Sequence, residues 1–413
     1  MIALHRWRGL WAAFFALFLL AACAGGLRQA SSPESVGLSS EKLNALKAEL
    51  QRDSEQGAIA GAVLLVGRHG KIGYFEAIGY RDREAKVPMT DDTIFRIASM
   101  TKPLVTIGAL MLVDEGKLDL SAPVAQYIPE FRDVMVGVET KDAAGHVTIA
   151  MEAPQRAMTV QDLMQHTSGL TYGVFGKSAI KDLYNKANLF DPRQTNAEFA
   201  AKIAKLPLQN QPGAKWDYSM SVDVLGRVVE IASGQELEAY LKARVLEPLG
   251  MKDTGFYIDD PDAKARLAQP AIEAKTGKRP QMPDKVTRSA WQSGGAGMVS
   301  TAMDYARFCQ FLLNGGELDG VRLVSEKTFK AMLMPHVPAA GQAFGWGFLI
   351  LVKEAPTNPG SLGDFGWPGV YGTYFWVSPK QDMYAVFMSQ VPAAIREQYR
   401  QMVRKQVTGA IIE

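Results

Sequence analysis

The spacing Ser-x-x-Lys places a hydroxyl and an amine where the amine can assist deprotonation of the hydroxyl. It occurs three times in the 413 residues: at Ser39–Lys42, Ser99–Lys102 and Ser178–Lys181. The first serine precedes a helix as a cap would, and the third lies in a Gly-flanked loop before a charged helix. Ser99 instead starts the most apolar helix of the chain, so the helix N-terminus points at its oxygen and Lys102 follows one turn later. We therefore predict that Ser99 is a nucleophile assisted by Lys102.

Other chemistries find little support in the sequence. There is no Gly-x-Ser-x-Gly, no Gly-x-Gly-x-x-Gly and no P-loop, and the five histidines lack metal-ligand spacing. We expect no metal and no cofactor. The 45 Lys and Arg are balanced by 43 Asp and Glu without a basic cluster, which argues against binding to nucleic acid.

The elements that position these residues can be placed from periodicity and turn residues. We predict helices over Glu41–Gln51, Thr101–Glu115 and Ala393–Thr408, a hairpin of Ile59–Val66 with Lys71–Ala77, and strands over Trp346–Val352, Tyr371–Val377 and Met383–Ser389. Between 118 and 289 the chain is mostly helical patches, such as Asn196–Ile203. The prediction is an α+β fold: an antiparallel sheet flanked by helices (about 41–117 and 290–413) with an inserted, mainly helical domain (about 118–289).

The N-terminus has the composition of a targeting signal. Residues 1–22 combine a basic start with an apolar run of 14 residues, which is short for a membrane span of ~20. Leu20 to Cys23 resembles a bacterial lipobox, which predicts a lipid anchor on Cys23, a tether over 23–40 and a location on the periplasmic side of a bacterial membrane. Plain cleavage and an uncut anchor are the alternatives. Cys309, in an apolar helical pattern, is expected to be a buried thiol.

Five spaced motifs carry a family resemblance. They are Phe95–Phe131, Met158–Leu170, Gln211–Ser219, Glu247–Met251 and Ser293–Ser300. In this order, over about residues 35–408, the chain resembles the serine β-lactamase and penicillin-binding-protein superfamily. The likeness is greatest to the class C-like branch and to family VIII carboxylesterases.

The resemblance implies roles for particular residues. Ser99 matches the acylated nucleophile, Lys102 the assisting lysine, and Tyr218 the tyrosine that exchanges protons with the nucleophile and the leaving group. A nearby ammonium stabilises a phenolate, which suits that role. The backbone N–H groups of Ser99 and Val370 are implied as the oxyanion hole.

Two departures from the class C pattern bear on specificity. Met220 stands where those enzymes have an asparagine, and Trp367-Pro368-Gly369 stands where they have Lys-Thr-Gly on an edge strand, here expected just before a strand Val370–Trp376. The replacement removes charge that would hold a β-lactam carboxylate and offers an apolar wall. We therefore expect Trp367, Pro368 and Gly369 to contact substrate.

Three further polar residues are interpreted as structural. His166 belongs to a His-Thr-Ser-Gly turn after a helix, Asp162 is expected to be a cap, and Asp223 a surface residue. The predicted function is a serine hydrolase that cleaves small to medium carboxylic esters, with a small-molecule ester and, through the lipid anchor, a membrane as partners. The alternatives are a β-lactamase or D,D-peptidase, and a catalytically silent binding protein.

Overall fold

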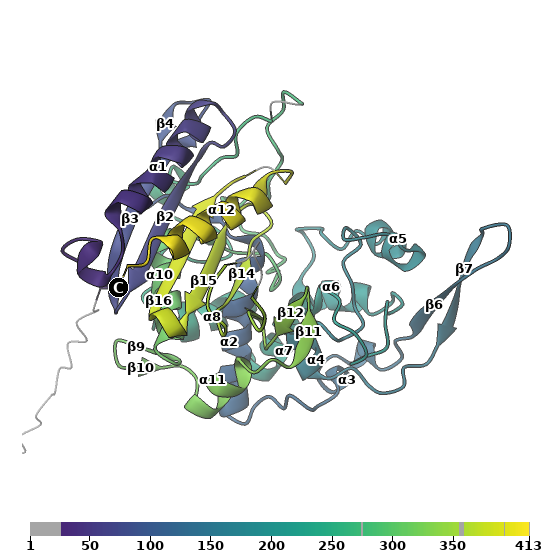
Figure 1. The fold of residues 1–413 in the computed structure, drawn as a ribbon. Helices are drawn as coiled ribbons and strands as arrows, with labels where there is room; N and C mark the ends of the chain where they lie inside the picture. The colour runs from purple at the N-terminus through teal and green to yellow at the C-terminus, as the bar shows by residue number, and fades with distance from the viewer. Residues whose placement is uncertain (1–25, 274–275, 355–358, 392, 413) are drawn as a thin grey trace, which may run out of the picture.

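A ten-stranded sheet built from both ends of the chain forms the centre of the fold (Figure 1). The computed structural model describes residues 26–273, 276–354, 359–391 and 393–412. The strand order is β1-β3-β2-β16-β15-β14-β13-β12-β11, with β4 also paired to β3. All pairs are antiparallel except the short pair β1–β3. The strands of the sheet are β1 Arg28–Gln29, β2 Gly61–Arg68, β3 Lys71–Asp82, β4 Val87–Pro88, β11 Val337–Ala339, β12 Gln342–Phe344, β13 Leu349–Ile350, β14 Phe365–Pro368, β15 Tyr374–Ser378 and β16 Met383–Ser389.

Helices cover both faces of this sheet, as the alternation of side chains along β2 requires. Leu64 and Val66 point to one face, where they share a core with α1 (Ser40–Glu55) and α12 (Arg396–Gly409). Val63 and Leu65 point to the other face, toward the larger core that includes α10 (Ala302–Leu313). The α+β prediction is therefore confirmed.

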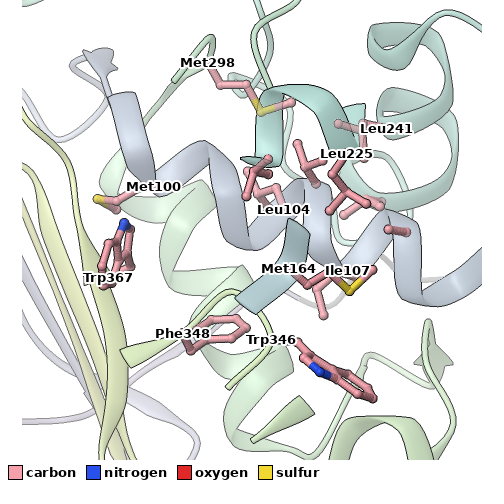
Figure 2. Packing of buried hydrophobic residues seen from close by; sticks show 14 of the residues in the cluster. Met100, Leu104, Ile107, Met164, Leu225, Leu241, Met298, Trp346, Phe348 and Trp367 are labelled. Atoms are coloured by element: carbon pink, nitrogen blue, oxygen red, sulfur yellow. The ribbon is translucent and has the colours of Figure 1, made fainter. Parts of the chain in front are cut away.

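The larger core of the molecule is assembled around α2 (Thr101–Asp114), which is buried along almost its whole length. Figure 2 shows Leu104 and Ile107 of α2 among side chains from several elements, including Met164, Leu225 and Leu241. Gly108 allows the close approach of α8, because a Cβ there would lie 2.6 Å from Leu241 Cδ2. The other helices are α3 Val124–Tyr127, α4 Val160–Gln165, α5 Ala179–Lys186, α6 Asn196–Ile203, α7 Ser221–Ser233, α8 Leu237–Leu241, α9 Pro261–Lys264 and α11 Glu326–Met332.

Shorter elements connect these parts. Three two-stranded ribbons are formed by β5 Phe95–Arg96 with β8 Val299–Ser300, β6 Val136–Lys141 with β7 Val147–Glu152, and β9 Glu317–Leu318 with β10 Val321–Arg322. One-turn 3₁₀ helices are formed by Glu34–Val36, Ala98–Met100, Pro129–Phe131 and Pro379–Gln381, and α8 continues into a π-helical turn, Lys242–Leu246. The β6–β7 hairpin projects from the molecule in Figure 1 and was not predicted, although Val147, Ile149 and Met151 occupy alternate positions along β7.

Several expected elements need correction. The strand expected over Trp346–Val352 is reduced to β13, and the strand expected from Val370 begins only at Tyr374. Trp367 and Pro368 lie inside β14 instead of just before a strand. They pair with β15, whereas β14 pairs with β13 only through Phe365 and Gly366. The inserted domain and its boundaries remain a prediction.

The N-terminal expectations are only partly covered by the structure. Residues 1–22 and Cys23 lie outside the described residues. From Arg28 onward the expected tether lies against the domain instead, because β1 pairs with β3 and Leu38 is fully buried. Cys309 is a buried thiol, as predicted. Within the described ranges, no helix has the length and apolar character that crossing a membrane requires.

Candidate active site

Ser99 lies in the single 3₁₀ turn that leads into α2. The preceding residue, Ala98, has a φ of 45°, a left-handed conformation that an alanine adopts only under constraint. The constraint comes from the neighbouring backbone, since β5 pairs with β8 and the Ile97 N–H donates to the Met298 carbonyl at 3.1 Å. The serine hydroxyl is thereby held at the N-terminus of the buried helix.

Lys102 is buried, with 1% of its surface exposed, so its charge must be satisfied inside the protein. Its ammonium donates to Ser99 Oγ at 3.3 Å, to the Tyr172 hydroxyl at 3.2 Å and to the Gly295 carbonyl at 2.7 Å. An ammonium has three N–H groups, and each of them has an acceptor here. Lys102 is therefore not a solvated lysine behind a serine that merely caps the helix.

Tyr218 also contacts Ser99. Its hydroxyl donates to Ser99 Oγ at 2.7 Å, and Lys102 Nζ lies 4.6 Å from the centre of its ring. The indole N–H of Trp367 donates to the same tyrosine oxygen at 3.4 Å. Three residues predicted from the sequence, Ser99, Lys102 and Tyr218, thus meet at one point.

Asp223 corrects one of the sequence predictions. It was expected at the surface but is only 2% exposed, in the first turn of α7. Its carboxylate accepts from Ser293 Oγ at 2.5 Å and from the Gly295 N–H at 3.0 Å, and burial raises its pKa although Lys102 favours its charged form. No signal in the local sequence marked this burial, because Asp223, Arg227 and Glu230 recur at helical spacing as the polar face of α7.

Tyr172 was missed entirely. Burial, followed by the nearby charges of Asp223 and Tyr218, raises the pKa of Tyr172 well above its usual value, so it stays a neutral phenol. Its hydroxyl accepts from Lys102 and holds the ammonium beside Ser99. Nothing in the local sequence marks this tyrosine, because its contact with Lys102 joins two distant segments.

His166 supports Tyr218 without touching Ser99. It ends α4 in a left-handed conformation (φ 56°), and its Nδ1 accepts from the Ser219 N–H at 3.3 Å. Its ring meets the Tyr218 ring edge-on, with centroids 4.9 Å apart. Burial lowers the pKa of His166 well below its usual value, so the imidazole is neutral, in line with a structural role.

Asp162 is part of a cap, as predicted. It forms a capping box with Thr159 at the start of α4 and pairs with Arg156. Its pKa lies below its usual value because these hydrogen bonds outweigh the effect of burial.

The segment from Trp367 to Val370 passes close to Ser99. A Cβ on Gly369 would lie 2.3 Å from the Ile97 carbonyl oxygen, so only glycine allows this approach. The Gly369 carbonyl accepts from the Arg400 guanidinium, and a trans peptide then directs the Val370 N–H the opposite way. Val370 and Ser99 line the same cavity.

Trp367 is placed differently from a substrate-contacting wall. It is 8% exposed and packs its ring against Tyr218 and Phe344, each with centroids 5.2 Å away. Figure 2 shows it beside Met100, near the start of α2. Trp367, Pro368 and Gly369 are not among the residues that line the cavity at Ser99. Their contact with substrate therefore remains a prediction.

A cavity of about 520 Å³ opens at Ser99 and Tyr218. Much of its wall is apolar, with Val174, Phe175, Phe190 and Trp291 among the lining residues. Three of these are substantially exposed at its rim: Val174, Phe175 and Phe190. Within the described ranges, no cluster of three or more His, Cys, Asp or Glu is arranged to hold a metal ion.

We predict that Trp367→Phe lowers kcat for ester hydrolysis about three- to tenfold and leaves KM almost unchanged. The phenyl ring preserves packing but removes the N–H that stabilises charge on the Tyr218 oxygen, a contribution of about 1 kcal/mol. Steady-state kinetics on a p-nitrophenyl ester measure both constants. A rise in KM with constant kcat would instead place Trp367 in contact with substrate.

Comparison with known proteins places this arrangement in context. The beta-lactamase family model matches residues 46–406. Protein Rv1367c of Mycobacterium tuberculosis is 36% identical over 368 residues, covering 84% of this chain and 90% of the relative. Esterase EstB of Burkholderia gladioli is 34% identical over 341 residues, covering 77% of this chain and 83% of EstB.

Solved structures agree with this relationship. EstCE1, a hydrolase with promiscuous acyltransferase activity, superposes with a TM-score of 0.75 at 26% identity, covering 89% of this chain and 98% of EstCE1. Esterases and acyltransferases of this kind among the relatives support serine hydrolase activity. The chain belongs to the beta-lactamase family, on the side of its family VIII esterase-like members.

Proposed function

We propose that the protein is a carboxylesterase that acts through an acyl-enzyme on Ser99. The observation that carries the proposal is the position of Ser99 Oγ, 2.7 Å from the Tyr218 hydroxyl and 3.3 Å from Lys102 Nζ, at a largely apolar cavity. A serine hydroxyl becomes a strong nucleophile when an adjacent base takes its proton, and these two groups can supply that base. The similarity to esterase EstB adds support.

In the acylation step, Ser99 Oγ attacks the ester carbonyl while its proton moves to the Tyr218 oxygen, which acts as a phenolate and must therefore first lose the proton that it donates to Ser99 Oγ in the structure. The buried Lys102 ammonium and the Trp367 N–H favour that phenolate. The tetrahedral oxyanion would be bound by the N–H groups of Ser99 and Val370. Tyr218 then protonates the departing alkoxide, the C–O bond breaks, and the acyl group stays on Ser99.

Deacylation repeats the sequence with water. Tyr218 takes a proton from a water molecule, whose oxygen attacks the acyl carbon, and the proton returns to Ser99 Oγ as the acid leaves. Tyr172 does not compete for these protons, because burial keeps it neutral. Lys102 is held in place by its hydrogen bonds to the Tyr172 hydroxyl and the Gly295 carbonyl.

The alternatives are less well supported by the residues around Ser99. A β-lactamase or D,D-peptidase would profit from a cation at the position of Trp367, where this chain has an indole packed against Tyr218. A silent binding protein would not need Ser99, Lys102 and Tyr218 in mutual contact. The lipid anchor on Cys23 and an exported, periplasmic location also remain proposals.

We expect kcat/KM for p-nitrophenyl butyrate to exceed that for benzylpenicillin by at least one to two powers of ten. The missing charge-assisted hydrogen bond to the β-lactam carboxylate alone contributes about 1.5–3 kcal/mol. Initial rates with both substrates, and intact mass after incubation with each, test this expectation. Faster turnover of benzylpenicillin would replace the esterase proposal with the β-lactamase alternative, and no turnover of either would favour the silent protein.

A further inference from the structure

A second buried lysine, Lys285, lines the same cavity as Ser99. It is 8% exposed, and its ammonium donates to the Gly297 carbonyl at 2.5 Å. Lys102 donates to the Gly295 carbonyl, two residues earlier in the same turn. One turn therefore binds the ammonium groups of both lysines, which ties the position of Lys285 to that of the reacting groups.

Among the described residues, no carboxylate lies within ion-pair distance of the Lys285 ammonium. The hydrogen-bond acceptor of Lys285 there is the Gly297 carbonyl. The nearby Arg96 is also buried and donates to two carbonyl oxygens, of Pro283 and Ala268. The adjacent acid, Asp284, is exposed, and its carboxylate accepts the Val286 N–H. Arg96 does not itself line the cavity, so this part of the wall holds one desolvated cation, Lys285, and one exposed carboxylate, Asp284.

The other cations of the cavity wall are arranged differently. Arg193 pairs with Asp191 at 2.9 Å, and Arg288 pairs with Glu236 at 3.0 Å. Both arginines are well exposed, so solvent also screens their charge. Lys285 differs from them because it is a buried cation of the cavity wall with a single hydrogen-bond acceptor, the Gly297 carbonyl, among the described residues.

Such an ammonium is costly to the folded protein unless something offsets the lost hydration. Burial, together with the charge of Arg96, lowers the pKa of Lys285 to about 8, so it remains mostly protonated at neutral pH. An anionic group entering the cavity would supply the missing acceptor. A purely bracing role, in which Lys285 only holds the Gly297 turn, is the competing explanation.

We propose that Lys285 binds a carboxylate of the substrate, so that the preferred esters carry a free carboxylate on their acyl or alcohol part, away from the scissile bond. This inference rests on the proposed esterase function and names its substrate class. This way of binding a carboxylate differs from the one expected of a β-lactamase. There a cation stands at the position of Trp367, whereas here the cation is Lys285, from the segment before the Gly297 turn. Gly295, which binds Lys102 beside Ser99, and Gly297, which binds Lys285, are two residues apart, so their Cα atoms lie at most ~7 Å apart. A substrate with a short chain can therefore reach from Ser99 to Lys285.

The test compares matched pairs of substrates that differ only in charge. For the acyl side these are the mono-p-nitrophenyl esters of adipic and suberic acid and their methyl-capped forms. For the alcohol side they are 4-butyryloxybenzoate and its methyl ester. The enzymes are the wild type, Lys285→Met, which keeps length and removes charge, and Lys278→Met, which removes an exposed charge of the same segment outside the cavity wall.

In at least one pair, Lys285→Met should lower kcat/KM for the carboxylate roughly ten- to hundredfold and leave the methyl ester within about twofold. Lys278→Met should change neither. An equal loss of kcat/KM for both members of each pair would establish the bracing role and overturn the proposal. No change in kcat/KM for any substrate would also overturn the proposal.

The wild type provides a second, independent measurement if Lys285→Met does not fold. Faster hydrolysis of the carboxylate than of its methyl ester in any of the three pairs supports the proposal, and the absence of such a preference in every pair overturns it. Failure of the underlying esterase function is distinguishable, because the wild type would then hydrolyse no ester of either kind.

Discussion

Replacing Ser99 with alanine is expected to lower kcat for ester hydrolysis by at least about 10⁴-fold while the protein stays folded. Without the hydroxyl no acyl-enzyme can form, and residual activity would come only from binding and from groups that stabilise the oxyanion. The side chain of Ser99 contributes little to the core, so the melting temperature should remain nearly unchanged. Initial rates with p-nitrophenyl butyrate and a thermal melt of Ser99→Ala measure both effects.

The chain offers its own control for this substitution. Ser39 also stands three residues before a lysine, but its hydroxyl caps α1 by accepting the Lys42 N–H at 3.3 Å. Ser39→Ala should therefore lower stability by about 1 kcal/mol and leave kcat unchanged.

A fluorophosphonate should label the peptide that contains Ser99. Retention of more than a few per cent of kcat in Ser99→Ala would show that another residue is the nucleophile.

The second large effect concerns the pair that moves the proton. Lys102→Met and Tyr218→Phe should each reduce kcat about 10²- to 10⁴-fold, the range in which a positioned acid or base contributes. The double variant should be at most a few-fold slower than the worse single variant, because groups that act as one unit are not additive. Pre-steady-state measurement of p-nitrophenol release follows acylation directly. Two independent, multiplicative losses would mean that they do not share a proton path.

Tyr172→Phe is the matched control for Tyr218→Phe. Both remove one hydroxyl near Lys102, but only Tyr218 contacts Ser99 Oγ. Tyr172 stays neutral, so its loss should cost only the position of the ammonium, a few-fold in kcat. If Tyr172→Phe lowered kcat as much as Tyr218→Phe does, the assignment of Tyr218 as the proton acceptor would be wrong.

The local parts of this site could be predicted from the sequence, and the long-range parts could not. Ser99 and Lys102 lie one helical turn apart, so the apolar pattern of α2 was enough to join them. Tyr218 is distant in the chain and was placed only through the family resemblance. Asp223 was misplaced because its burial depends on Ser293 and Gly295, which pack on α7 from another segment.

The sheet shows the same division. Met383–Ser389 was predicted to the residue, since a run of β-branched and aromatic residues buried on both faces needs no partner to be recognised. Trp346–Val352 has a similar composition, yet Gly347, with a φ of 82°, interrupts it and leaves only β13. The orientation of Trp367 toward Tyr218 follows from the pairing of β14 with β15, which composition does not encode.

The pairing of β2 with β16 also has a consequence for how the protein is made. Ser389 Oγ donates to the Gly61 carbonyl, 328 positions earlier in the chain, and β16 lies between β2 and β15. β16 is therefore synthesised long after the hairpin with which it pairs. Contacts of this sequence separation are slow to form, and until they do the hairpin presents an unpaired edge. The nascent chain must be protected from aggregation until β16 has been synthesised, and a product truncated before β16 would keep the nucleophile segment yet lack the sheet on which it depends.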